Sequence, residues 1–379
     1  MNRFLFVLLF VGGCQIELPD ACTILAGTTL CADSGVDSDS GGAGMAHHGG
    51  HGGTSVPAGT GGAGEAGAAG AAGTGGHHDA GASGAGTGGV GGGSHGGHGG
   101  LEVKLPLPAA RPGSKTFDVR FTGEMPAPDA GGIGAARTVC EFSHVNFDDS
   151  IVYPGQFGKS HAHVYVGADK SDANGIGAGA GGTCRGGTAN LSSYWFPALL
   201  RPDGSVIVPI EAHIYLKNSN YDTEGPVEHL PKGLKVVVGD MLATGPQNEF
   251  YLHWSCVDNG SIQSATIPDC GGGPVSFDAH FPQCWTGQLD SPDHKSHMSY
   301  PVNGRCPTSH PRKIPAYSFH IRYANVPRGS NLSCGNQYCI HADLVTGWDE
   351  DIVNTMVDRC VNTGLSCGSH MVGDGRVLD

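Results

Sequence analysis

Residues 41–100 hold 28 of the 65 glycines in this chain of 379 residues, and Ala, Ser, Thr and His make up most of the remainder. Such a segment has almost no apolar surface to bury, so it cannot offset the entropy that ordering would cost. We expect residues 41–104 to form a disordered Gly/His-rich linker. Folding is then left to residues 105–379, which are numerous enough to form one large domain with a hydrophobic core.

The chain begins with MNRFLFVLLFVGGC, in which one Arg precedes a short apolar run that ends in small residues and Cys14. This pattern is typical of a secretory signal and is too short to span a bilayer. Because the cysteine stands where a bacterial lipobox places its lipidated residue, we predict a lipoprotein signal peptide over residues 1–14 and a lipid on Cys14. The protein would then lie on the periplasmic or extracellular face of an outer membrane. The alternative is an ordinary signal with an incidental cysteine.

The chain has 13 cysteines, and removing Cys14 leaves an even number, as a set of disulfides in an exported protein requires. Residues 15–40 form a short segment that contains two of them, Cys22 and Cys31. The other disulfide candidates are Cys140, Cys184, Cys256, Cys270, Cys284, Cys306, Cys334, Cys339, Cys360 and Cys367. No CxxC pair occurs, so a cysteine-based zinc site is poorly supported.

The formal net charge is −14, and the sequence contains no run of Lys or Arg residues. Nucleic acid is therefore not an expected partner. The sequence also lacks the H-E-x-x-H motif of zinc proteases and the phosphate-binding P-loop.

Short apolar runs bounded by Gly, Pro, Asn and Asp recur along residues 105–379, for example FDVRFTG, SVIVPIEAHIYLK and EFYLHWSCV. Runs of this length and composition predict strands separated by turns. A single segment, WDEDIVNTMVDRCVN, has helical spacing of apolar residues, with Asp349 as its N-cap. We therefore predict an all-β fold, a large disulfide-linked β-sandwich or jelly-roll-like domain with one C-terminal helix.

The run SHAHVYVG places His161 and His163 one residue apart, and CIHADLV repeats this spacing with His341 and Asp343. Alternate residues of a strand point to the same face, so each run can present two ligands together. Three imidazoles and one carboxylate suit a divalent metal, zinc or copper. The alternative is that these histidines belong to hydrogen-bonded core networks.

The run DHKSHMSYP concentrates further polar groups, and we predict Asp293, His294 and His297 as catalytic residues, His297 as an acid/base or extra metal ligand. Lys295 in the same run is a predicted ligand-binding residue. Tyr194, Trp195 and Trp285 are also predicted ligand-binding residues. Trp195 and Trp285 are the candidates for stacking on sugar rings, since both lie close to turn residues. A further alternative is a pair of carboxylates that hydrolyses glycosides, for which the candidates are Asp148, Asp149, Asp293 and Asp343.

Several ordered motifs, among them DDSIVYPGQFGKSHAHVYVG, TCRGGTANLSSYWFPAL, FPQCWTGQLDSPDHKSHMSYPVNGRCPTSHP and HADLVTGWD, resemble the secreted domain-of-unknown-function family nineteen ninety-six. The resemblance covers residues 117–360. It implies an exported protein of the kind found in fungi and bacteria, where some members are joined to sugar-binding modules of the WSC type. It assigns no catalytic residue.

We therefore hold two functional hypotheses. The first is a metal-binding domain that acts on cell-wall or extracellular polysaccharide, with a membrane contact through its lipid. The alternative is a non-catalytic glycan- or surface-binding module on a flexible tether.

Overall fold

The computed structural model describes residues 22–25, 28–31, 101–221 and 223–379. In the N-terminal part, β1 (Cys22–Leu25) pairs with β2 (Thr28–Cys31) as an antiparallel ribbon whose register sets Cys22 opposite Cys31. The predicted signal peptide, the lipidation site Cys14 and residues 41–100 of the predicted linker lie outside the described residues.

Two large sheets dominate the domain. Sheet A has five strands in the order β14-β23-β10-β7-β6. Its strands are β6 (Phe142–Asn146), β7 (His163–Gly167), β10 (Ser193–Pro197), β14 (Lys235–Gly239) and β23 (His341–Val345).

Sheet B has eight strands in the order β16-β15-β17-β21-β13-β5-β24-β4. Its strands are β4 (Ala127–Pro128), β5 (Ala135–Cys140), β13 (Glu211–Lys217), β15 (Leu252–Cys256), β16 (Asn259–Ser264), β17 (Val275–His280), β21 (Ala316–Tyr323) and β24 (Leu365–Ser366). All neighbouring pairs in the two sheets are antiparallel except β24 with β5.

Short strands form small sheets around these two. They are β3 (Val119–Glu124) with β25 (Gly375–Leu378), β8 (Ser171–Asp172) with β9 (Gly175–Ile176), β12 (Val206–Ile207) and β22 (Asn331–Leu332) on either side of β11 (Leu199–Leu200), and β19 (Met298–Ser299) and β20 (Arg312–Lys313) on either side of β18 (Cys284–Trp285).

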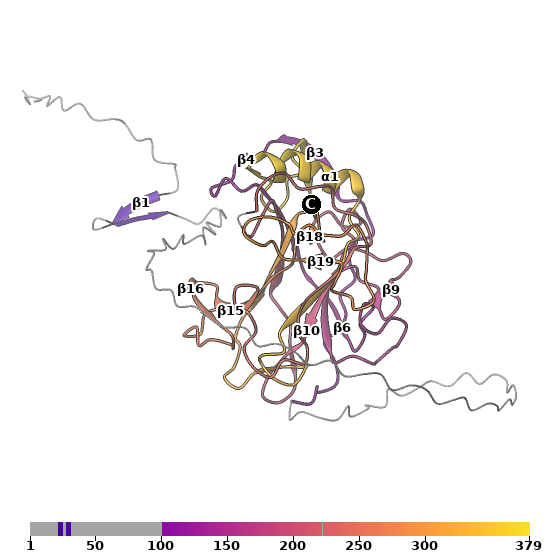
Figure 1. The fold of residues 1–379 in the computed structure, drawn as a ribbon. Helices are drawn as coiled ribbons and strands as arrows, with labels where there is room; N and C mark the ends of the chain where they lie inside the picture. Colours follow the sequence, from indigo (N-terminus) through magenta and orange to yellow (C-terminus); the bar gives the residue numbers. More distant parts are fainter. Residues whose placement is uncertain (1–21, 26–27, 32–100, 222) are drawn as a thin grey trace, which may run out of the picture. The chain divides into compact units, whose positions relative to one another are not determined.

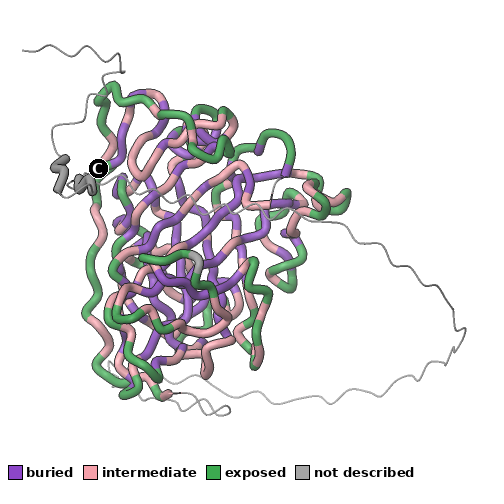
Figure 2. The backbone as a smooth tube through the Cα atoms, turned by 90° about the vertical axis from the view of Figure 1, so that its left-hand side faces the viewer, coloured by how far each residue is buried: buried purple, intermediate pink, exposed green. Residues whose placement is uncertain are grey.

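The inner faces of sheets A and B share one hydrophobic core. Tyr194 and Phe196 of β10 point into it, and their rings lie 5.4 Å from Phe319 and 6.1 Å from Phe277 of sheet B. Because side chains alternate along a strand, the residues between these point to the outer face of each sheet. The prediction of a β-sandwich-like, all-β fold is confirmed. Figure 2 shows the buried backbone running through the middle of the domain, with exposed segments around it.

The predicted C-terminal helix is present as α1 (Glu350–Arg359), followed by a short 3₁₀ turn, η1 (Val361–Thr363). The carboxylate of Asp349 accepts a hydrogen bond from the amide of Ile352, as an N-cap does. The helix buries its apolar stripe in the core and lies beside β3 and β4 at one end of the domain (Figure 1). Among the described residues, none of the helices has the length and apolar character needed to cross a membrane.

Five disulfides link the ten predicted cysteines of the domain, so the disulfide-linked character is confirmed. The pairs are Cys140–Cys184, Cys256–Cys270, Cys284–Cys306, Cys334–Cys339 and Cys360–Cys367. Disulfides in this number suggest an extracellular or exported protein.

Candidate metal centre

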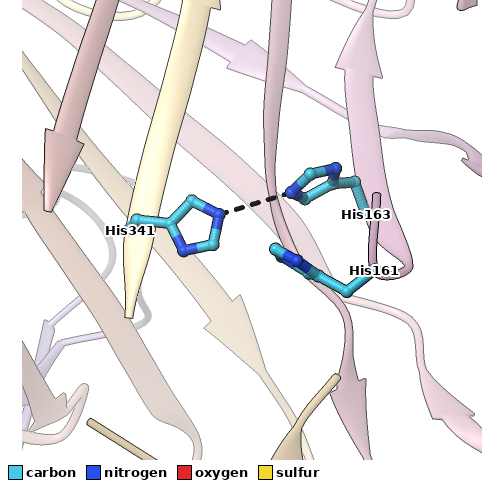
Figure 3. A group of neighbouring side chains, drawn as sticks. All are labelled: His161, His163 and His341. Atoms are coloured by element: carbon cyan, nitrogen blue, oxygen red, sulfur yellow. Dashed lines mark hydrogen bonds between the residues drawn. The ribbon is translucent and has the colours of Figure 1, made fainter. Parts of the chain in front are cut away.

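Three histidines meet on the outer face of sheet A (Figure 3). His163 is the first residue of β7 and His341 is the first residue of β23. These two strands are not direct neighbours, because β10 lies between them. The residue of β10 that pairs with His163 is Pro197, and the register of the sheet places it in line with His341. Proline has a small ring, so two imidazoles can approach each other above it.

The two imidazoles face each other through their acceptor nitrogens. Nε2 of His163 lies 3.3 Å from Nε2 of His341. The opposite nitrogens are both donors, because Nδ1 of His163 bonds to the carbonyl of Asp148 at 2.9 Å and Nδ1 of His341 to the carbonyl of Cys339 at 2.7 Å. In neutral rings, two lone pairs therefore point at one another, an arrangement that a cation between them stabilises.

His161 completes the group from the segment just before β7. Its ring centre lies 4.3 Å from that of His163 and 5.0 Å from that of His341, and both contacts are edge-on. Its Nε2 is buried without a hydrogen-bond partner among the described residues. The ligand nitrogens of the three histidines all lie within 4.8 Å of one another.

Two buried carboxylates border the histidines. Asp343 extends from β23, and both of its oxygens are buried without a hydrogen-bond partner among the described residues. Asp149 uses Oδ1 to accept the amides of Ile151 and Val152, each at 2.8 Å. Ligand atoms of Asp149, Asp343 and His163 form a second group within 4.8 Å. Isolated buried carboxylates are costly, so this pair needs a cation or protons.

Residues 147–160 cover the centre. The carbonyl of Asp148 accepts both Nδ1 of His163 and the hydroxyl of Tyr165, the latter at 2.8 Å. Ile151 from the same segment packs on Tyr165 and Trp195 of the outer face. The cover therefore excludes water from one side while it fixes the orientation of His163.

Burial shapes the protonation of these groups. It lowers the pKa of His163 to about 4 and that of His341 to about 3, and it lowers the pKa of His161 well below its ordinary value. Burial also raises the pKa of both carboxyls, that of Asp343 very far. Without a cation, burial therefore favours the uncharged forms of the imidazoles and of the two carboxyls. The imidazole nitrogens need lose no proton to bind a metal at neutral pH.

This donor set fits a divalent transition metal. Imidazole nitrogens and carboxylate oxygens are ligands that zinc accepts, and copper also binds imidazole well. The His161, His163, His341 and Asp343 set that the sequence predicted is brought together, and Asp149 joins it. The sequence marked Asp149 only as a candidate for sugar hydrolysis, because nothing in its spacing showed that the segment folds back over β7.

The predicted catalytic residues lie in a separate loop. Nε2 of His297 bonds to the carbonyl of Lys235 at 2.6 Å and Nδ1 to the hydroxyl of Ser291 at 2.9 Å, so both nitrogens hold the loop in place. Asp293 accepts four hydrogen bonds from Ser291, Lys295 and Ser296. His294 pairs with Asp290 at 2.9 Å. None of them joins the described metal-ligand groups, and these contacts favour a structural role.

Lys295 is the residue of this loop that reaches the centre. Its ammonium group donates to the carbonyl of Gly239 at 2.6 Å, and Gly239 pairs with His341 in sheet A. Its positive charge acts on both His341 and Asp343.

The three aromatic residues predicted to bind a ligand are all buried, so none of their rings is open to the solvent. Tyr194 faces the core, and Trp195 lies under the cover of residues 147–160, stacked on Tyr165. Trp285 is buried with its indole N–H bonded to the carbonyl of Gln288 and Arg312 over its ring. Proximity to turn residues did not reveal which way each ring points.

A family model described as "Domain of unknown function (DUF1996)" matches residues 149–348. The matched stretch contains all five groups of the centre, from Asp149 to Asp343. No curated protein and no solved structure is matched by the chain.

Proposed function

The chain belongs to the family of that model, as its motifs predicted, and we propose that its β-sandwich is a divalent-metal-binding domain that acts on polysaccharide outside the cytoplasm. One observation carries the metal proposal. Two imidazole nitrogens with fixed lone pairs face each other at 3.3 Å beside a buried carboxylate that lacks any donor among the described residues. A bound cation satisfies all of these groups together.

We propose zinc or copper as the metal. Three imidazoles suit either ion, whereas magnesium and calcium prefer sites made mostly of oxygen. A metal at this position would polarise a bound group or activate a water molecule. Since the cover of residues 147–160 closes one side, the approach for a substrate is the His161 side, where this histidine is only half-buried.

The polysaccharide part of the proposal rests on two supports. First, some members of the family that the sequence resembles are joined to sugar-binding modules. An open pocket of about 620 Å³ also adjoins the covering segment, and its lining includes Ser150, Lys235 and Val345. None of the five groups of the centre lines this pocket, so it would hold a part of the polymer away from the metal. The competing proposal is a non-catalytic glycan-binding module, which would bind glycans and release no product.

For the attachment of the protein, we propose a lipid on Cys14. The apolar run that ends at this cysteine supports the proposal, and the five disulfides of the domain agree with export. Replacing Cys14→Ser should shift the protein from the membrane fraction to the soluble fraction.

Metal content of the full-length chain tests the main proposal. Inductively coupled plasma mass spectrometry is applied after incubation with zinc or copper and extensive dialysis. Residues 41–100 contain seven histidines, and a His-rich tract can bind metal loosely, so the informative quantity is the difference between chains that share this segment. We expect His163→Asn and Asp343→Asn each to lose about one ion per chain relative to wild type.

The matched control is His229→Asn, which replaces an exposed histidine bonded to Asp358 and should leave the content unchanged. Equal metal contents in wild type and His163→Asn would contradict the proposal.

A further inference from the structure

A loop that a disulfide closes lies directly before one ligand of the metal centre. Cys334 and Cys339 are five residues apart, the shortest separation among the disulfides of the described residues. The bond joins the segment after β22 to the segment before β23, whose first residue is His341. No other disulfide of the described residues has a cysteine within two positions of a ligand of the centre. We call residues 333–339 the disulfide loop.

The second cysteine of the disulfide loop orients His341. The backbone carbonyl of Cys339 accepts a hydrogen bond from Nδ1 of His341 at 2.7 Å. Both residues are buried, so water does not replace this bond. With the proton held on Nδ1, Nε2 is the acceptor that faces Nε2 of His163 at 3.3 Å. The carbonyl thus fixes both the tautomer and the direction of a histidine ligand.

The other end of the disulfide loop contacts the run that holds the two remaining histidines. The hydroxyl of Ser333 donates to the carbonyl of Ala162 at 2.6 Å, and Ala162 lies between His161 and His163. The amide of Ser333 donates to the carbonyl of Ala198 at 2.9 Å, and the amide of Ala198 donates to the same Ala162 carbonyl at 2.9 Å. The disulfide loop therefore connects the two runs that supply the three imidazoles.

The disulfide is the covalent restraint on the shape of this loop. Residues 335–339 form no helix or strand, and Gly335 has a φ of 118°, a conformation open mainly to glycine. Other restraints are hydrogen bonds of half-buried side chains. Asn336 accepts the amide of Tyr338 at 2.6 Å, and Gln247 donates to the carbonyl of Tyr338 at 2.7 Å. When the loop opens, water can satisfy these polar groups, whereas only the disulfide links the two ends covalently.

We propose that the Cys334–Cys339 disulfide is a positioning element of the metal centre, and that the centre reaches its full affinity for zinc only after this bond has formed. An open loop would leave the Cys339 carbonyl and the Ser333 hydroxyl free to move, so the three imidazoles would be less well aligned. This inference rests on the metal of the proposed function. It adds a covalent condition on metal binding to the set of ligands.

The disulfide would form by thiol–disulfide exchange with a protein disulfide, which serves as the oxidant. The thiolate of one cysteine attacks that disulfide and forms a mixed disulfide, which the thiolate of the second cysteine then resolves. Two electrons and two protons pass from the two thiols to the oxidant, which leaves as a dithiol. Since such oxidants act on exported chains and not in a reducing cytoplasm, metal loading would follow export.

The test compares the zinc affinity of variants of the full-length chain, measured by competition with a zinc-binding dye. The double variant Cys334→Ser and Cys339→Ser lacks the bond, and its serines cannot bind zinc as free thiols would. We expect it to bind zinc about tenfold more weakly than wild type, because the carbonyl that orients His341 is no longer held. Ser333→Ala keeps the disulfide and removes the bond to Ala162, so it should weaken zinc binding by about threefold.

The matched control for the double variant is Cys256→Ser and Cys270→Ser, which removes a disulfide at the end of β15 in sheet B. For Ser333→Ala the control is Ser299→Ala, which removes another hydroxyl bonded to a backbone carbonyl. Both controls should bind zinc as wild type does. Unchanged affinity in the variants of the disulfide loop, or a loss of equal size in the controls, would overturn the inference. If the double variant does not fold, Ser333→Ala decides alone.

A readout without metal separates a positioning role from a merely structural one. Long-range proton–nitrogen correlation spectra of the metal-free chain, labelled in its histidines, report which nitrogen of His341 carries the proton, and His341→Asn assigns the signals. We expect the Nδ1–H form in wild type and a mixture of both forms in the double variant of Cys334 and Cys339. Equal zinc affinity and the same tautomer in both proteins would overturn this inference alone, whereas a wild type that binds no zinc would overturn the metal proposal as well.

Discussion

The outer faces of sheets A and B use the same residue types in opposite ways. On sheet A, His163 and His341 turn acceptor nitrogens toward each other and toward Asp343, which has no donor among the described residues. On sheet B, the Asp278 carboxylate is surrounded by hydroxyl and imidazole donors. The number of histidines and aspartates therefore does not identify a metal site. The balance between donors and acceptors does so, because only a deficit of donors calls for a cation.

The largest difference in the free energy of unfolding should appear between variants that replace one or the other of the two buried aspartates. Asp278→Ala should lower the free energy of unfolding by about 3–5 kcal/mol, since it leaves several buried donors without an acceptor. Asp343→Asn in metal-free protein should change it by less than about 1 kcal/mol, because this carboxyl has no donor to lose. Urea denaturation in a chelator measures both. Similar losses in the two variants would break the comparison.

The stability gained on metal addition should depend on the residues of sheet A and not on those of sheet B. Zinc at about a hundredfold excess over its dissociation constant should stabilise the wild-type domain by about 2.7 kcal/mol relative to chelated protein. Differential scanning calorimetry should show a higher Tm for wild type. The increase should vanish in Asp343→Asn and persist in His253→Asn, which alters sheet B. An increase of equal size in all three proteins would place the metal elsewhere.

Acid should destabilise the domain through the sheet B histidines. Burial lowers the pKa of His280 to about 3 and that of His213 to about 4, below the unfolded value near 6.5. The unfolded chain therefore binds more protons between about pH 6.5 and pH 4. Each such proton costs about 1.4 kcal/mol of stability per pH unit as the pH falls through this window.

The raised pKa values of Asp149 and Asp343 act in the opposite direction in metal-free protein, so the useful quantity is a difference between variants. His280→Gln should show a shallower loss of stability than wild type in urea titrations at pH 7, 6 and 5. Parallel curves for the two proteins would show that His280 does not remain neutral on folding.

A smaller effect is expected at the hydroxyl of Tyr165, which shares the Asp148 carbonyl with His163. Tyr165→Phe should reduce stability by about 1 kcal/mol and weaken zinc binding by about tenfold, because the covering segment is held less firmly. Competition with a zinc-binding dye measures the affinity. A variant with unchanged zinc affinity would separate the cover from the metal centre.

The smallest effect is expected in the loop of residues 290–297. His294→Ala should change stability by less than about 0.5 kcal/mol and leave the metal content unaltered, since its ring bonds only to Asp290 among the described residues. Loss of the bound ion in this variant would show that the loop contributes to metal binding.

Much of the fold follows from local patterns. Apolar runs between Gly, Pro, Asn and Asp became strands. The segment with helical spacing of apolar residues became α1, and Asp349 caps it by accepting the amide of Ile352. The order of strands in a sheet has no such local signature. Nothing near His163 or His341 shows that β10 runs between their strands with Pro197 at the crossing. The spacing within each pair of ligands was predictable, and their meeting was expected only on chemical grounds.

The remaining differences arise from surroundings that the sequence does not specify. Asp149 becomes a neighbour of the histidines because residues 147–160 fold back over β7. Trp195 has turn residues nearby in the sequence, but the same segment covers its ring. Four aromatic rings that contact one another, those of Tyr221, Phe250, Tyr251 and Tyr300, likewise come from three separate parts of the chain.

The disulfides of the domain join its cysteines in the order in which they occur along the chain, first to second, third to fourth, and so on to the last pair. The longest separation within a pair is 44 residues. A chain that crosses a membrane from its N-terminus therefore always exposes the correct partner next. We therefore expect oxidation of each cysteine as it emerges to favour the native pairs over non-native ones.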